Sequence, residues 1–203
     1  MQDVVLYATD TMADWEYAYL TTGMAMAAEE QPDRFRLRVL ADRQQEVTTA
    51  GRLRLQTDGD LGDVALDTVA LLVLPGADTW FDGQERVLGL ARTLLDRGVP
   101  VAGICGATYG LARAGLLDSR QHTSNARDFL ASSGYAGTDH YRDERVVDDG
   151  GLITAPATAP VDFSAAIFRR LELFPPEIID AWYGLYTTGE RRYYDALVGA
   201  ESA

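Results

Sequence analysis

The sequence contains no lysine and only one cysteine among its 203 residues. Without lysine, a mechanism through a lysine Schiff base is impossible, and all 18 basic residues are arginines. The single cysteine, Cys105, excludes an intramolecular disulfide and a cysteine-rich zinc site. The two histidines, His122 and His140, do not stand at metal-ligand spacing with the scattered acidic residues. We therefore expect neither a metal nor a cofactor.

Long hydrophobic runs and an excess of basic charge are missing as well. No apolar run approaches the ~18 residues that suggest a membrane span, and residues 1–3 lack the basic region of a secretory signal. A formal net charge of −13 argues against binding to nucleic acid or to an anionic membrane surface. With 47% hydrophobic and 24% charged residues, the composition indicates a soluble globular protein, which we expect in the cytoplasm.

Predicted strands alternate with predicted helices along most of the chain. Apolar or alternating runs predict strands at residues 3–8, 35–40, 69–74 and 99–104, and hairpins at 47–56 and 145–155. Helical periodicity follows residue 14 and residue 105, and covers residues 84–97 and 161–173. This alternation predicts an α/β protein, a three-layer sandwich with a central, mostly parallel sheet.

The pattern breaks at Phe174-Pro175-Pro176 and continues as a tail helix. We therefore expect an α/β domain over residues 1–173 and a helical extension over residues 174–203. The extension carries an apolar face that must be covered, either by its own domain or by a second copy of the chain. For a homodimer, the expected contacts are Trp182, Tyr183 and Tyr186.

Cys105 stands where the period changes from strand to helix. A side chain at such a sharp turn is lifted out of the sheet, and the small residues Gly103 and Ala107 permit the bend. A lone cysteine is more often a small buried apolar residue, but this position favours a nucleophile. The helix N-terminus is expected to lower the pKa of the thiol.

Two other strand ends are expected at the same edge of the sheet. Glu16 follows the first strand, and Pro75-Gly76-Ala77 follows the strand at 69–74. The backbone amides of Ala77 and Gly106 could hold an oxyanion, although such a turn by itself only ends a strand. His122 is a candidate general acid or base, whereas His140 is expected to be structural. The predicted pocket residues are Trp15, Trp80, Tyr109 and His122.

Glu16 and Cys105 are expected to share one proton. A carboxyl group desolvated at the strand ends has a raised pKa, so Glu16 is expected to keep the proton and donate it in a hydrogen bond to a thiolate. The alternative is an ionised Glu16 that faces water.

These motifs resemble the ThiJ/PfpI superfamily, a group of flavodoxin-like, class I glutamine-amidotransferase-like proteins. The resemblance covers residues 3–173 and rests on Glu16, the Leu74-Pro75-Gly76-Ala77 turn, the elbow at residues 103–107 and the segment His122-Thr123-Ser124-Asn125. It implies Cys105 as nucleophile, Glu16 as its carboxyl partner, the amides of Ala77 and Gly106 as an oxyanion hole, and His122 as a nearby base. The family's protease and glyoxalase branches usually carry histidine directly after the nucleophile, where this chain has Gly106.

Three functions follow from these observations. The first is a cysteine-dependent hydrolase or lyase that acts on a small amide, a reactive carbonyl or an isocyanide. The second is a non-catalytic stress protein that senses oxidants through Cys105. The third is a binding domain whose cysteine is inert. Peptidase activity is disfavoured because no second base stands beside the nucleophile.

Overall fold

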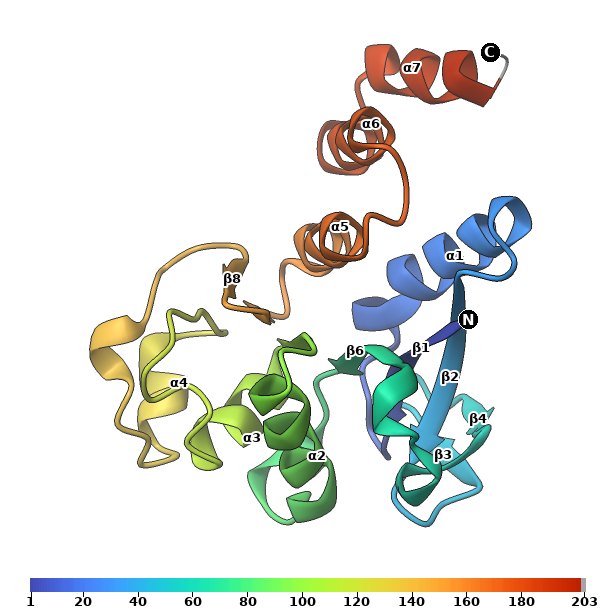
Figure 1. Ribbon diagram of the computed structural model, residues 1–203. Helices are drawn as coiled ribbons and strands as arrows, with labels where there is room; N and C mark the ends of the chain where they lie inside the picture. Colours follow the sequence, from blue (N-terminus) through green and yellow to red (C-terminus); the bar gives the residue numbers. More distant parts are fainter. Residues whose placement is uncertain (202–203) are drawn as a thin grey trace.

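In residues 1–201, which the computed structural model describes, a sheet of seven strands runs through the centre of the protein (Figure 1). The strands are β1 (Gln2–Ala8), β2 (Phe35–Ala41), β5 (Gly59–Asp60), β6 (Val69–Leu74), β7 (Val101–Ile104), β8 (Val147–Asp149) and β9 (Leu152–Ala155). Their order is β5-β2-β1-β6-β7-β9-β8, and all neighbours are parallel except β8 and β9. The prediction of a mostly parallel central sheet is confirmed.

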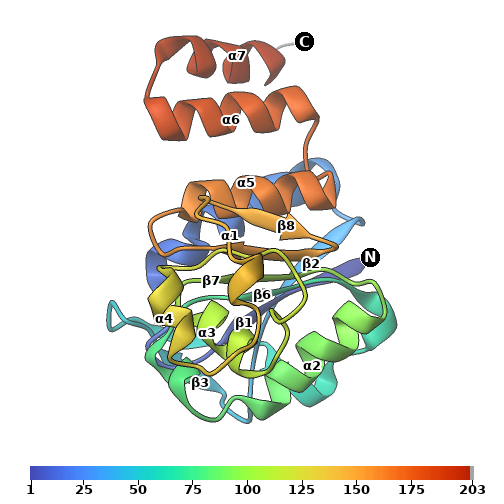
Figure 2. The same cartoon turned by 90° about the vertical axis from the view of Figure 1, so that its left-hand side faces the viewer.

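Helices cover both faces of this sheet, which makes the three layers (Figure 2). Helices α1 (Asp14–Glu30) and α5 (Pro160–Leu171) lie on one face. Helices α2 (Glu85–Asp96) and α3 (Gly106–Arg113) lie on the other, with the short α4 (Arg127–Ala131) beside α3. Because both faces are covered, the central strands β1, β6 and β7 are almost continuously apolar and buried. Within residues 1–201, no helix has the length and apolar character that crossing a bilayer requires.

Both predicted hairpins form. Strands β3 (Glu46–Thr48) and β4 (Arg54–Gln56) pair antiparallel in a small separate sheet. Strands β8 and β9 pair across Gly150 and Gly151, both of which have a positive φ. Glycine adopts this conformation without strain, and the turn therefore closes tightly.

The segment after Pro175 forms two helices, α6 (Pro176–Thr188) and α7 (Arg191–Glu201), stacked outward from α5 (Figure 2). Trp182 of α6 packs edge-on against Tyr19 and Phe168, and the Tyr183 hydroxyl donates to Asp162 Oδ1 at 2.8 Å. Trp182 and Tyr183, two of the three residues expected at a dimer interface, thus make these contacts inside their own chain. The third, Tyr186, is half exposed.

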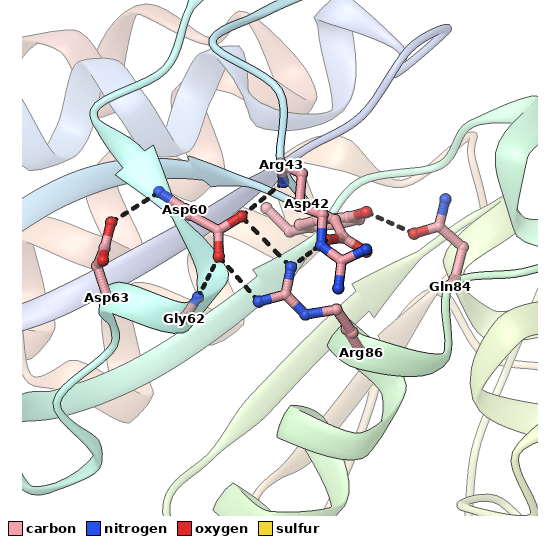
Figure 3. A network of polar contacts seen from close by, with 8 residues as sticks. Asp42, Arg43, Asp60, Gly62, Asp63, Gln84 and Arg86 are labelled. Carbon is pink, nitrogen blue, oxygen red and sulfur yellow. Dashed lines mark hydrogen bonds and ion pairs between the residues drawn. The ribbon is translucent and has the colours of Figure 1, made fainter.

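Arg86 connects the loops next to β5, the edge strand of the sheet (Figure 3). Arg86 of α2 pairs with Asp42, which directly follows β2, and with Asp60 at 2.8 Å. Asp60 also accepts hydrogen bonds from the backbone amides of Gly62 and Arg43. These interactions hold the pKa of Asp60 far below its usual range. The loops after β2 and β5 are thereby tied to the start of α2.

Two helical glycines make a matched test of the packing between α1 and α5. A Cβ on Gly23 would lie 2.4 Å from the buried ring of Phe168, whereas a Cβ on Gly89 of α2 would meet nothing within 4 Å. We expect Gly23→Ala to lower the free energy of unfolding, because overpacking costs ~1–3 kcal/mol and outweighs the helix propensity of alanine. Gly89→Ala should raise it by roughly 0.5–1 kcal/mol. Urea unfolding measures both, and an equal gain in the two variants contradicts this packing.

Candidate functional site

Cys105 occupies a strained turn between β7 and α3. Its backbone has φ 58° and ψ −122°, a region that non-glycine residues rarely adopt. Three hydrogen bonds hold it there: its N–H donates to Ala155 O at 2.9 Å, and its carbonyl accepts from the amide and the hydroxyl of Thr108 at 3.1 and 2.6 Å. The Thr108 hydroxyl also bonds to the Ser124 hydroxyl at 2.6 Å. The predicted elbow is confirmed, with Cys105 half-buried at the N-terminus of α3.

Glu16 reaches the same point from the first turn of α1. Its side chain is buried, and its Oε2 accepts a hydrogen bond from the Gly76 amide at 2.6 Å. A Cβ on Gly76 would lie 2.7 Å from Glu16 Oε2, 2.6 Å from Cys105 Cβ and 2.9 Å from Cys105 Sγ. Only glycine fits between the carboxyl group and the sulfur. The structure thus brings Glu16, Gly76 and Cys105 together.

The other carboxyl oxygen of Glu16 has no hydrogen-bond partner. Oε1 is buried, and none of the described residues donates to it. A buried acceptor without a donor disfavours the ionised carboxylate. Desolvation is the main reason that the pKa of Glu16 is raised to about 7, and the hydrogen bonds with the Gly76 amide and the Cys105 side chain oppose it.

The thiol pKa is raised rather than lowered. Burial and the neighbouring Glu16 carboxylate raise the pKa of Cys105 to about 11, against hydrogen bonds from Asn125 and the Gly106 amide that stabilise the thiolate. The expectation of a thiol pKa lowered by the helix N-terminus is therefore wrong. With the higher pKa on sulfur, the shared proton lies on Cys105, and Glu16 is the group that ionises first.

The turn at Ala77 lies against Gly106, the residue that follows Cys105. A Cβ on Gly106 would lie 2.8 Å from Ala77 O and 3.2 Å from Ala77 N, so the turn approaches the elbow closely. On either side of Ala77, the amide of Gly76 donates to Glu16 and that of Asp78 donates to Thr11. The Ala77 amide itself has no acceptor among residues 1–201. Gly106 is the first residue of α3, so its amide has no acceptor within the helix.

Asn125 makes a contact with the sulfur that its place in the sequence does not predict. Its Nδ2 donates to Cys105 Sγ at 3.4 Å, and its Oδ1 accepts from the Ala157 amide at 2.8 Å. The second bond fixes the orientation of the amide, so that the NH₂ group faces the sulfur. Asn125 lies three residues after His122. His122 is the titratable residue of this segment, whereas an amide side chain such as that of Asn125 gives no comparable signal in a sequence.

His122 is buried inside the protein, and its ring hydrogen-bonds to groups other than the sulfur. Its side chain is fully buried, with Nδ1 bonded to Arg120 O at 2.8 Å and Nε2 to the Tyr135 hydroxyl at 3.2 Å. Its ring packs edge-on against Tyr135 and Tyr141. Burial lowers the pKa of His122, which favours the neutral imidazole. Both ring nitrogens are engaged, so the structure does not place this histidine as a proton carrier at Cys105.

The other predicted pocket residues separate into two groups. Trp80 is fully buried; its indole Nε1 donates to Pro75 O at 2.7 Å, and its ring packs on Gly110. Trp80 therefore packs under the surface and holds the turn at Pro75 in place, and it does not line an open pocket. Trp15 is exposed, and Tyr109 is half-buried in a cluster with Phe81 and Phe129. In the part of the chain that is described, no three His, Cys, Asp or Glu side chains group as metal ligands.

The raised pKa of Glu16 predicts a pH-dependent stability. Between pH 4.5, its ordinary value, and about pH 7, the folded chain binds a proton that the unfolded chain has released. The free energy of unfolding should therefore fall as pH rises through this window, by about 3 kcal/mol relative to Glu16→Gln. Urea unfolding from pH 4 to 8 measures the difference. Glu85→Gln, an exposed acid in the first turn of α2, is the control and should show no such trend; parallel curves for wild type and Glu16→Gln would disprove the assignment.

Comparison with known proteins shows the family to which the chain belongs. Residues 2–170 match the DJ-1/PfpI family. The chain is 34% identical to the "uncharacterized protease YoaZ" of Bacillus subtilis over 200 residues, which cover 96% of this chain and 95% of that protein. A crystal structure of a ThiJ/PfpI family protein from Bacillus anthracis superimposes with a TM-score of 0.87 at 32% identity, covering 98% and 97% of the two chains. The DJ-1 superfamily protein Atu0886 from Agrobacterium tumefaciens, also 32% identical, gives 0.79 over 94% of this chain and 100% of its own. The chain therefore belongs to the DJ-1/PfpI family.

Proposed function

We propose that this protein is a cysteine-dependent hydrolase or lyase for a small molecule, with Cys105 as its nucleophile. The observation that carries the proposal is the placement of a buried carboxyl group beside the elbow sulfur, with only Gly76 between them. The substrate class is one with an electrophilic carbon: an amide, a reactive carbonyl or an isocyanide. The sulfur is half-buried and the neighbouring Asn125 is exposed, so the sulfur can be reached from solvent.

In the proposed mechanism, Glu16 acts as the general base. Its carboxylate takes the thiol proton as sulfur bonds to the substrate carbon, and returns that proton to the leaving or adjacent heteroatom. Water then adds to the carbon bound to sulfur, the C–S bond breaks, and a proton returns to sulfur, which releases the product and restores the thiol. The amides of Ala77 and Gly106 hold the negative charge that develops on the substrate. Asn125 stabilises the thiolate through its Nδ2–H. His122 supports the fold of the loop that carries Asn125.

Peptide cleavage is not part of this proposal, although the relatives from Bacillus subtilis are named uncharacterized proteases. A second base directly after the nucleophile has no space, because a Cβ at position 106 would press on the backbone of Ala77 at 2.8 Å. Among residues 1–201, Glu16 is the ionisable side chain beside the sulfur, which supports its role as the base.

Oxidant sensing is the second candidate, favoured by the half-buried thiol and its hydrogen-bond donors. In that reaction, a peroxide oxidises the thiol to a sulfenic acid and is itself reduced to an alcohol or water. The raised thiol pKa opposes it, since thiolate is the reactive form. Pairing of two chains and a cytoplasmic site of action stay predictions.

Turnover of a substrate panel tests the enzyme. Methylglyoxal, small amides and isocyanides should include a compound that the wild type converts and Cys105→Ala does not. The rate should rise with pH through about 7 as Glu16 ionises. In Glu16→Gln, this rise with pH should disappear, and the rate should fall by roughly 10²-fold or more. The control variant Glu85→Gln should keep the pH dependence and the rate of the wild type. If peroxide oxidises Cys105 stoichiometrically and the protein converts no compound of the panel, oxidant sensing is the function and the enzyme hypothesis is wrong.

The thiol pKa tests where the shared proton lies. Removal of the carboxylate charge in Glu16→Gln should lower the pKa of Cys105 below about 11, whereas Asn125→Ala should raise it by removing a donor to the thiolate. The rate of alkylation by iodoacetamide against pH measures these values. A higher thiol pKa in Glu16→Gln would instead place the proton on Glu16, as a donor to the thiolate.

A further inference from the structure

A groove of about 660 Å³ separates α1 from α6 and α7, on the side of the sheet that carries α5. Along α1, the residues that line the groove run from Ala18, in the second turn of the helix, to Glu30 at its end. The wall opposite is α6, and Leu197 of α7 contributes at the edge. A volume of this size is typical of small-molecule sites, which span roughly 300–1,000 Å³.

The floor and walls of the groove are aromatic. Phe168 forms the floor beneath α1, where Gly23 leaves room for its ring. Tyr19, Trp182 and Tyr186 form one ring cluster, with Tyr19 edge-on to Trp182 at 5.9 Å and to Tyr186 at 5.3 Å. Aromatic faces bind apolar groups, and their negative quadrupole also attracts cations.

The charge of the lining has one sign. Glu30 and Glu177 are its charged side chains, and both are exposed. Neither carboxylate has an ion-pair or hydrogen-bond partner among the described residues. The nearby guanidinium of Arg34 is occupied by Gln31 and by the carbonyls of Leu171 and Glu172. Nothing in the described chain neutralises the two acids.

We propose that this groove binds a hydrophobic cation: a small molecule with an alkyl or aryl body and an ammonium group. The body covers the aromatic and aliphatic surface, and the ammonium group lies at the end of the groove where Glu30 ends α1 and Glu177 stands in the first turn of α6. An anion of the same shape is repelled by the two acids and by the net charge of −13. A neutral molecule gains the apolar contacts alone. This site is separate from Cys105 and does not depend on the proposed enzyme activity.

A second copy of the chain is the competing occupant, and the charges argue against it. The cations that an incoming α7 could offer are Arg191 and Arg192. Arg191 already pairs with Asp195 at 2.8 Å, and Arg192 pairs with Glu190 at 3.0 Å. A docked α7 would bring these acids along with its arginines and leave Glu30 and Glu177 uncompensated.

The experiment compares three probes that share one tail. Octyltrimethylammonium, octyl sulfate and octanol are titrated below their aggregation limits into the full chain, with calorimetry and tryptophan fluorescence as readouts. We expect the cation to bind at least tenfold more tightly than the anion, and 500 mM salt to narrow the difference. Glu30→Gln/Glu177→Gln should lose about tenfold for the cation and nothing for octanol. Thr22→Trp, which fills the groove, should weaken the binding of the cation and of octanol.

A charge-matched control separates the groove from the overall charge. Glu85→Gln/Asp96→Asn removes two exposed acids from α2, on the opposite face of the sheet, and should leave cation binding unchanged. Equal affinity for the cation and the anion overturns the proposal, and so does an equal loss in the control. A sedimentation mass of two chains that returns to one chain in Met26→Glu, a residue of the groove lining, would show that a second copy fills the groove instead.

Discussion

The close approach of three chain segments at Gly76 is the constraint on which the rest of the site depends. The turn after β6, the elbow after β7 and the first turn of α1 meet where a single added carbon would collide with Cys105 and Glu16. Gly106 permits the second close contact, between the elbow and Ala77. Parallel strands place these segments at one edge of the sheet, and the two glycines let them touch.

The electrostatics of the pair follow from that packing. A carboxyl group and a thiol that share a desolvated space do not both ionise near neutral pH. Desolvation raises both pKa values, and the charge on Glu16 raises the pKa of Cys105 further. The hydrogen bond from the Gly76 amide favours the charge on Glu16, and the raised pKa of sulfur keeps its proton. The strain at Cys105 is balanced by bonds from β9 and from Thr108, which do not involve the sulfur. The nucleophile is thus held by its backbone while its side chain stays available for chemistry.

The helical extension is attached by a buried charge as well as by apolar contacts. Asp162 at the start of α5 accepts from Arg145 and from the Tyr183 hydroxyl, and it is almost fully buried. Arg145 is contributed by the segment before β8, so one carboxylate links the sheet edge, α5 and α6. Helix α7 packs mainly on α6, with Tyr193 against Gly184. The groove between α1 and the extension stays open because α7 does not return to the body of the protein.

The sequence by itself determined the order and type of the main elements, the elbow at Cys105 and the strand ends that meet there, because apolar periodicity and glycine positions are local signals. It also singled out Glu16, whose place in the first turn after β1 follows from topology. Tertiary structure decided the rest. His122 is buried, and its two ring nitrogens bond to the carbonyl of Arg120 and the hydroxyl of Tyr135. Asn125 contacts the sulfur because the Ala157 amide orients its side chain, and Trp80 lies in the core. The thiol pKa also needed the fold, since desolvation by distant segments outweighed the helix N-terminus, and no local pattern in the sequence records that burial.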